Sequence, residues 1–411
     1  MKRISAEDKR LKILSVATDY FLNCGYDGCT LDQVAAGAKV GKQAIYEFFE
    51  NKEELYSEVV RSNIVVQPLD DLPSDQPVHQ VISDYILKMI HQNAGLPVYG
   101  MMRTNILAYR RLPALADSLH QSRRNGARPL QVYLEALQDQ GKIDLHAMDP
   151  LNVATRIAGV ATQGTRAYMG FGWPDDDRRR DNAQWSTKLV LEGCDCHQEP
   201  IAQAKNVGDH LRSGERPPSM RLAKDRFDEL CSTALLLFFE HGFDGMSIDH
   251  LVELTGVSRA TIYRNFHDKD GFFRFVVERE VKRSSQSPLE SGRGDGFEHG
   301  LQLLARQLMD GHAQDHNLAM YRLLIEEADR VPDLARAFYD GQIDRVIPPL
   351  TAIYQQYLGH PPCEKCVVAF HTLATFGVRF LTSAAPLSVD EKIKLSRETA
   401  KIMTLPLLRS H

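Results

Sequence analysis

The chain contains one sequence pattern twice, and this repeat constrains its architecture more than any other feature. Residues 25–52 recur as residues 242–269, with Gly-aromatic-Asp-Gly at the start and an Ile-Tyr pair in the middle of each copy. Every matched pair, such as Tyr46 and Tyr263, lies 217 residues apart without an insertion. Self-similarity at a fixed period marks a repeated structural unit, and so long a period indicates duplicated domains and not a solenoid.

The second copy has the periodicity of short helices. Apolar residues in the segment 226–240 follow helical spacing, and Gly242 is expected to end that helix. The next helix boundaries are predicted from caps and breaks at Ser247, Gly256, Ser258 and Asp268. The order is helix, turn, short helix, glycine turn, short helix, which is typical of a helix-turn-helix.

The first copy gives the same prediction with different residues. Thr30 and Gln33 form a capping box at the start of the second helix. Gly41 precedes a third helix expected over residues 42–48, and Asn51 caps a fourth. Two different sequences thus predict one structure.

The second copy resembles the head of the TetR/AcrR family of transcriptional regulators. Its run TGVSRATIYRNFHDKD, residues 255–270, is similar to the family pattern Ala-Gly-Val-Ser-Lys-Gly-Thr-Leu-Tyr-x-x-Phe-x-x-Lys-Glu. The resemblance implies an all-α protein in which each unit has an N-terminal helix-turn-helix head and a C-terminal helical domain for ligand binding and dimerisation. Family members usually carry one unit per chain and form homodimers, so this chain resembles two tandem units packed as an intramolecular pseudo-dimer.

Composition and weaker similarities set the expected domain boundaries. A 411-residue chain is too long for one growing core, and its 43% hydrophobic and 25% charged residues are those of an ordinary globular protein. The repeat continues faintly after each head at an offset of 219, where Arg103 answers Arg322. The expected domains are a first head (1–60), a first C-terminal domain (61–194), a linker (195–220), a second head (221–283) and a second C-terminal domain (284–411). We call residues 1–194 the first unit and residues 221–411 the second unit.

The second head supplies the stronger set of candidate DNA contacts. A helix-turn-helix places its second helix in the major groove, with N-terminal residues at the base edges. That geometry nominates Arg259, Ala260, Thr261 and Arg264 for base contacts, and an arginine suits guanine. The resemblance adds phosphate contacts from Ser247, Ser258, Tyr263 and Lys269.

The first head departs from the family pattern. Lys39 stands where the family has Gly, Gly41 replaces the capping Ser and Glu47 occupies the place of Arg264. The residues that remain usable are Thr30, Lys42, Gln43, Tyr46 and Lys52, and Gln43 is suited to adenine. We therefore predict that both heads bind DNA, that the first binds more weakly, and that the operator is an imperfect or asymmetric repeat.

The C-terminal domains are expected to hold an effector pocket and the contact between units. Candidate pocket residues are Tyr99, Met102, Arg103, Ile106 and Tyr168 in the first unit, and Tyr321, Arg322, Ile325, Phe376 and Arg379 in the second. For the apolar members core packing is the favoured interpretation, whereas Arg103 and Arg322 are equally suited to an acidic ligand and to pairing with Glu326 or Asp117. Helices near 150–172 and 180–192 are expected to meet 362–382 and 388–404. Trp173 and Arg178 to Arg180 are expected in a surface loop.

The remaining features narrow the function. Seven cysteines fit a reducing cytosol better than a disulfide scaffold, and we expect no metal site, because neither Cys194/Cys196 nor Cys363/Cys366 has a second pair in its own domain. No membrane span, signal peptide, cofactor motif or catalytic constellation is recognised, so the protein is not expected to be an enzyme. The leading hypothesis is a one-component, ligand-responsive DNA-binding regulator in the bacterial cytosol, most often a repressor. Its expected partners are double-stranded operator DNA and a small-molecule effector. The alternative is a TetR-like protein that has lost DNA binding and sequesters a partner. A monomer is expected, or else a homodimer of pseudo-dimers.

Overall fold

The computed structural model of the protein describes residues 5–63, 72–73, 75–108, 112, 115, 121, 124–194, 216–286, 288–290, 294–375, 381 and 386–408. This part of the chain is helical and has no strand, apart from an isolated antiparallel bridge between Ile143 and Leu408. Within the same residues, no helix combines the length and apolar character needed to cross a membrane. The prediction of an all-α fold is confirmed.

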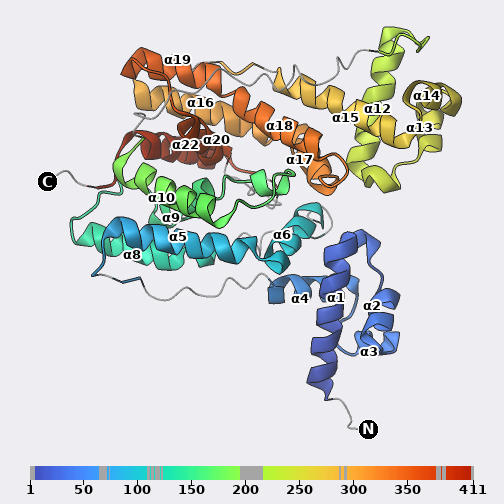
Figure 1. The fold of residues 1–411 in the computed structure, drawn as a ribbon, viewed down its shortest axis with the longest axis horizontal. Coiled ribbons are helices and arrows are strands. Elements are labelled where there is room, and N and C mark those ends of the chain that lie inside the picture. Colours follow the sequence, from blue (N-terminus) through green and yellow to red (C-terminus); the bar gives the residue numbers. More distant parts are fainter. Residues whose placement is uncertain are drawn as a thin grey trace.

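The helices fall into two similar series (Figure 1). The first unit contains α1 (Ala6–Gly28), α2 (Leu31–Ala38), α3 (Lys42–Tyr46), α4 (Lys52–Asn63), α5 (Val78–Ala94), α6 (Leu96–Ala108), α8 (Arg128–Asp139), α9 (Pro150–Ala161), the 3-10 turn η1 (Arg166–Tyr168) and α10 (Asp176–Glu192). The second contains α12 (Lys224–Gly245), α13 (Ile248–Thr255), α14 (Arg259–Phe266), α15 (Lys269–Ser285), α16 (Phe297–His312), α17 (Asp315–Glu326), α18 (Pro332–Asp344), α19 (Ile347–Leu358), α20 (Glu364–Thr375) and α22 (Val389–Thr404).

The positions that repeat in the sequence also match in their burial. Side chains that are fully buried in one head have fully buried counterparts 217 residues away in the other, so the same positions close both three-helix cores. These pairs are Ile13 and Leu230, Ala17 and Ala234, Phe21 and Phe238, Val34 and Leu251, Ile45 and Ile262, Leu55 and Phe272, and Tyr56 and Phe273. The matched burial means that both heads have the same packing and present equivalent faces to solvent.

The two heads also share their bend. Gly25 in α1 has φ 69° and ψ −179°, and Gly242 in α12 has φ 66° and ψ −178°, so each interrupts helical geometry before the turn to the next helix. A residue with a side chain is disfavoured in that conformation, which explains glycine at both positions. Gly242 thus breaks the helix as predicted, although helical turns continue to Gly245.

The units pack against each other through their C-terminal helices. α9 contacts α20, and α10 contacts α22. Arg156 of α9 is buried against α22, where it donates to Thr399 Oγ1 at 2.9 Å and lies 3.5 Å from a Glu398 carboxylate oxygen. The chain end joins the first unit, because the Leu408 amide donates to the Leu191 carbonyl at 2.9 Å. The helices predicted to form the contact between units are therefore in contact.

Two predictions about this region are wrong in detail. α9 ends at Ala161 and is followed by turns, because Gly164 and Gly170 have positive φ, so no helix spans 150–172. Arg178 to Arg180 lie in the first turns of α10 and not in a loop, while Trp173 is half-buried with its ring edge toward Tyr99. The backbones of the two units approach closely at Gly170, where an added Cβ would lie 3.2 Å from the Pro332 carbonyl oxygen.

The expectation of reduced cysteines is also contradicted. Cys194, just after α10, forms a disulfide with Cys366 in the first turn of α20, with a Cα–Cα distance of 6.6 Å. The two residues are 172 positions apart in sequence, and only the packing of one unit on the other brings them together. Because the two cysteines belong to different units, the sequence pattern of either unit alone does not pair them. Cys196 and His197 lie outside the described residues.

Candidate nucleic-acid interface

Each head places a short helix at its surface through a tight turn. In the second head the turn residue Gly256 has φ 67°, and Ser258 then caps α14 by accepting from the Thr261 amide at 3.2 Å. In the first head Lys39 adopts the same left-handed conformation with φ 57°, and Gly41 begins α3 without a side-chain cap. Non-glycine residues are disfavoured at positive φ, and a missing cap leaves helix amides unsatisfied. The disfavoured backbone at Lys39 and the missing cap of α3 are therefore structural reasons for expecting the first recognition helix to be less stable than the second.

The predicted base-reading residues of the second head lie on the outer face of α14. Arg259, Ala260 and Arg264 are exposed, and Thr261 and Tyr263 are half-buried. Arg259 forms an ion pair with Asp249 of α13. Arg264, by contrast, makes no ion pair with any residue that the structure describes, so its guanidinium is available to an incoming acceptor.

The predicted phosphate contacts of the second head are partly engaged within the protein. Ser247 caps α13 by accepting from the His250 amide at 3.4 Å. The Lys269 ammonium lies 4.7 Å from the centre of the Phe243 ring and donates to the Asp244 carbonyl at 3.3 Å. Burial lowers the pKa of Lys269, an effect that the Asp244 carboxylate opposes. The cation is thus positioned by an aromatic ring and not extended freely into solvent.

The first head presents a different surface. Thr30 forms the predicted capping box with Gln33, and Gln43 and Tyr46 are exposed on α3. The Lys52 ammonium lies 4.5 Å from the Tyr26 ring, as Lys269 does from Phe243 in the other head. The exposed face of α3 is thus polar and aromatic.

The carboxylate of Glu47, which is expected to oppose phosphate, has a partner. Lys9 of α1 donates to it at 2.9 Å. The ion pair is exposed, with Lys9 at 31% and Glu47 at 57% side-chain exposure, so it offsets the negative charge only in part. Sequence reasoning missed Lys9, because α1 and α3 come together only in the folded head.

The first cation of each recognition helix is paired with an acid of the preceding helix. Lys42 Nζ lies 3.0 Å from Asp32, and Arg259 is paired with Asp249, again at the 217-residue offset. The hydrogen bond to Asp32 raises the pKa of Lys42. Because the two pairs are equivalent, each head has the same intramolecular competitor for the cation that should meet DNA. The matched spacing of the two acids was a signal for this pair in the sequence.

The last residues of the expected linker, Ser219 and Met220, belong structurally to the second head. Ser219 Oγ donates to Asn265 Oδ1 of α14 at 2.7 Å, and Met220 is buried. Residues before 216 in the expected linker lie outside the described part of the chain. The residues just before α12 therefore pack on the recognition helix and do not connect the units loosely.

The second head is tied to its C-terminal domain at the bend of α12. The Arg330 guanidinium lies 3.7 Å from the centre of the Phe243 ring, 2.9 Å from Glu327 and 3.2 Å from Asp270. Glu327 in turn accepts from the Phe243 amide at 3.3 Å. A shift of the turn after α17 would therefore be transmitted to the start of the helix-turn-helix.

Both recognition helices lie at the same end of the molecule. In Figure 1, α2 and α3 of the first head and α13 and α14 of the second lie at the right-hand side, on the outer edges of their heads. The C-terminal helices α8, α9, α16, α19 and α22 lie on the other side. One chain therefore carries two exposed helix-turn-helix faces at one end of one body.

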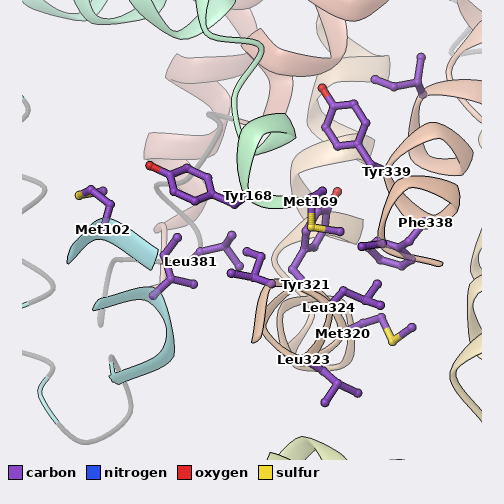
Figure 2. Packing of buried hydrophobic residues seen from close by; sticks show 14 of the residues in the cluster. Met102, Tyr168, Met169, Met320, Tyr321, Leu323, Leu324, Phe338, Tyr339 and Leu381 are labelled. Carbon is purple, nitrogen blue, oxygen red and sulfur yellow. The ribbon is translucent and has the colours of Figure 1, made fainter. Parts of the chain in front are cut away.

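The apolar effector candidates that the structure describes pack as core. Tyr99 stacks on Tyr168 with ring centres 5.0 Å apart, and Met102, Ile106 and Ile325 are buried. Figure 2 shows Tyr168 and Met169 of the first unit in the same buried cluster as Tyr321 of α17. Phe376 and Arg379 lie outside the described residues. For the described apolar candidates, burial agrees with the core packing that the sequence favoured.

The two arginines predicted at equivalent positions have different roles. Arg103 crosses between units, donating to the Ile325 carbonyl at 3.1 Å and the Glu326 carbonyl at 2.9 Å, with Asp329 at 3.1 Å. Arg322 is buried within its own unit and donates to the Leu381 carbonyl at 3.4 Å. A carboxylate that pairs with Arg103 is thus that of Asp329, while Asp117 lies outside the described residues. Arg103 satisfies the end of α17.

One cavity of about 460 Å³ lies beside the second head. Its walls come from α12, α15 and α17 and include Arg279, Glu280 and His316. The Glu280 carboxylate contacts His316 at 2.6 Å, and the neighbouring Arg283 and His316 contacts lower the pKa of Glu280 against the opposing effect of its burial. None of the predicted effector residues within the described part of the chain lines this cavity.

Comparison with known proteins is consistent with the two heads. The family of bacterial regulatory proteins described as tetR matches residues 13–59 and 230–276. Similar proteins include the uncharacterised HTH-type transcriptional regulator YhgD of Bacillus subtilis, 39% identical over 124 residues, which are 25% of this chain and 65% of that protein. The HTH-type transcriptional repressor ComR of Escherichia coli is 39% identical over 56 residues, covering 14% of this chain and 27% of that protein. The match thus spans less than two thirds of the length of either relative.

Two solved structures are similar to this chain at lower identity. One is from Mesorhizobium loti and is named as a putative TetR-family transcriptional regulator. The match covers 46% of this chain and 96% of that chain, with 19% identity and a TM-score of 0.38. The flavonoid-responsive regulator FrrA covers 44% of this chain and 95% of its own, with 18% identity and a TM-score of 0.39.

Proposed function

Because the chain belongs to the TetR family of bacterial regulatory proteins, we propose that it is a ligand-responsive repressor with two non-identical DNA-reading heads. It would act in the bacterial cytosol, bound to the nucleoid at its operator. The observation that carries this proposal is the placement of α3 and α14 at one end of a single chain, with different side chains on their exposed faces (Figure 1). A homodimer repeats one reading surface, whereas this chain has two.

The two heads read different half-sites in this proposal. Arg259 and Arg264 of α14 are suited to the paired acceptors of guanine, and Gln43 of α3 to adenine. Half-sites lie about one helical turn of DNA, or a multiple of it, apart. The operator is therefore an asymmetric or imperfect repeat, and the second head contributes more of the affinity.

Fusion of the units changes the energetics of binding. Once the second head is bound, the first meets its half-site as an intramolecular step at high effective concentration. A weak first head, with the Lys9–Glu47 pair and no side-chain cap on α3, can then still contribute. A single chain serves as the working unit, and pairing of two chains is the alternative.

Effector binding would act through the contacts between heads and C-terminal domains. Arg103 joins α6 to the end of α17 across the units, and Arg330 joins the next turn to the second head. A ligand that binds one arrangement of these helices more tightly shifts the population towards it. The heads then no longer match the spacing of the groove, which is the basis of release.

A second candidate function is sequestration of a partner without DNA binding. The intramolecular pairs Lys42–Asp32 and Arg259–Asp249 favour it, because they occupy cations that DNA would need. These pairs are exposed, however, and contribute little stability. Phosphate can therefore displace the acids at small cost, and we favour the DNA-binding function.

Selection of bound sequences from random duplex DNA tests the proposal. The wild-type chain should enrich two different half-sites at a fixed spacing. Replacing Arg259 and Arg264 by Ala should erase one half-site, and Lys42→Ala with Gln43→Ala should erase only the other. Lys88→Ala, an exposed change on α5, is the control and should leave both unchanged. Enrichment of no discrete sequence would instead support the sequestration function, and a palindrome read by two chains would contradict the proposed asymmetry.

A further inference from the structure

Three cysteine sulfurs from two units meet beside the interface of the C-terminal domains. Cys194 follows α10 in the first unit, Cys363 directly precedes α20 in the second, and Cys366 lies in the first turn of α20. Cys194 and Cys366 form the disulfide between units. The Cys363 thiol lies with its sulfur 3.3 Å from that of Cys366. The third sulfur is thus in contact with one end of an existing bond.

The surroundings of these sulfurs differ in access to solvent. Cys363 and Cys366 are 3% and 1% exposed, whereas Cys194 is half-buried. Lys365, between the two buried cysteines, crosses to the first unit and lies 2.9 Å from Asp181 of α10. The N-terminus of α20 favours a thiolate at its first turn. The bond can therefore be reached from the Cys194 side, while the Cys363–Cys366 pair is enclosed by the interface.

A disulfide in the reducing cytosol is not expected to be permanent. This step rests on the proposed function, which places the protein with DNA in the cytosol. Thiol reductants there keep most cysteines reduced, and the disulfides that do occur are usually transient or redox-sensing. A covalent bridge between the two DNA-reading units of a regulator is then a bond whose presence depends on the redox state.

We propose that Cys194, Cys363 and Cys366 form a thiol–disulfide exchange site that opens and closes the covalent link between the two units. In the first step, the Cys363 thiolate attacks the Cys366 sulfur. The Cys363–Cys366 bond forms, the Cys366–Cys194 bond breaks, and Cys194 leaves as a thiolate that takes up the proton lost from Cys363. No electrons enter or leave, and the units are no longer linked.

A second step resets the site with an external dithiol. Once the Cys194–Cys366 bond is open and the interface can part, one of the dithiol's thiolates attacks the Cys363–Cys366 disulfide, and the other then completes a disulfide within the reagent. Two electrons pass to the protein, which holds three thiols, and the dithiol is oxidised. Oxidised glutathione reverses the sequence by accepting two electrons as the Cys194–Cys366 bond re-forms.

Opening the link should loosen the pairing of units. The bond closes a loop between residues separated by 172 positions, and long loops are those that a disulfide constrains most in the unfolded chain. With the bond open, the non-covalent interface and the polypeptide between the units are what hold them together. We therefore expect a lower Tm for the reduced protein than for the oxidised protein, and no such difference for Cys194→Ser.

Trypsin separates the three sulfurs, which permits a direct test on the full chain. Cleavage after Lys188, Arg345 and Lys365 yields peptides 189–205, 346–365 and 366–379, which carry Cys194, Cys363 and Cys366 respectively. Protein treated with oxidised glutathione and then alkylated should yield peptide 189–205 linked to 366–379. Further incubation without added reductant should transfer part of the link to 346–365 with 366–379 by the first step alone, leaving Cys194 alkylated, and a dithiol should then release that second link.

Variants assign the roles. Peptide 189–205 also contains Cys196, so the link should survive in Cys196→Ser and disappear in Cys194→Ser. Cys363→Ser should keep the link but open it at least tenfold more slowly with the same reagent. Cys24→Ser, an exposed cysteine of the first head, is the matched control and should behave as wild type.

Three results would overturn the inference. They are the absence of any link between 189–205 and 366–379 after oxidation, opening of Cys363→Ser at the wild-type rate, and tight binding of one zinc ion that protects these cysteines from alkylation. None of the readouts uses DNA. Failure here therefore leaves the proposed function untouched, and failure of the DNA selection leaves the peptide map unchanged.

Discussion

The buried ion pair between α9 and α22 gives a sharp prediction about the contact between units. Arg156 and Glu398 are 3% and 6% exposed, with 3.5 Å between their charged groups. Arg156 also donates to Thr399 and to the Leu395 carbonyl, each at 2.9 Å, and Glu398 accepts from Asn152 at 3.2 Å. Arg156→Met removes all of the arginine's bonds and leaves the Glu398 charge buried with an amide as its partner. Removing one partner of a buried pair costs about 3–5 kcal/mol, mostly from the uncompensated charge.

The test is urea unfolding followed by circular dichroism. Arg156→Met should lower the free energy of unfolding by about 3–5 kcal/mol. Adding Glu398→Gln removes the stranded charge and should restore part of the loss. Arg180→Met breaks an exposed pair with Asp177 and should change stability by less than about 1 kcal/mol. A loss within about 1 kcal/mol for Arg156→Met, or no recovery in the double variant, would refute the reasoning.

Three further predictions concern the two heads and a pair of buried histidines in the second unit. Lys39→Gly relieves a left-handed backbone with φ 57° and should raise the unfolding free energy of the chain by up to about 1 kcal/mol in urea titrations; a loss would show that the lysine side chain stabilises the turn. Asp249→Ala releases Arg259 from its ion pair and should tighten binding to the selected operator several-fold in fluorescence anisotropy, whereas weaker binding would mean that Asp249 orients the arginine. Burial lowers the pKa of His312 to about 3 and of His371 to about 4, with further lowering by nearby positive charge. Between these values and the unfolded pKa of about 6.5 the unfolded chain binds more protons, so stability is lost as pH falls from about 6.5 towards 4, at up to about 1.4 kcal/mol per pH unit for each histidine. Replacing both by Asn should flatten that slope, and an unchanged slope would assign it to other groups.

The sequence predicted what depends on local chemistry. Caps at Thr30, Ser247, Ser258 and Asp268 were found where side-chain oxygens precede apolar runs, because an N-cap needs only its own next three residues. The breaks at glycines with positive φ follow from the same local rules. The repeat then extended each local prediction to the other head.

The predictions that failed concern contacts between segments far apart in sequence. Arg103 meets carbonyl groups more than 200 residues away, and such backbone acceptors leave no trace in side-chain composition. The Cys194–Cys366 bond crosses two units, so a search within each domain could not pair it. The helix expected over 150–172 failed because the apolar pattern continues beyond Ala161 while the backbone turns to pass Pro332.

The central claim is that one polypeptide reads two neighbouring half-sites with its own two heads. Mass measurement of the complex with a selected duplex, combined with hydroxyl-radical footprinting, tests it most directly. The account predicts one chain per duplex and protection of both half-sites on one face of the DNA. A complex of two chains in which each protects one half-site, or a single chain that protects only one, would contradict it.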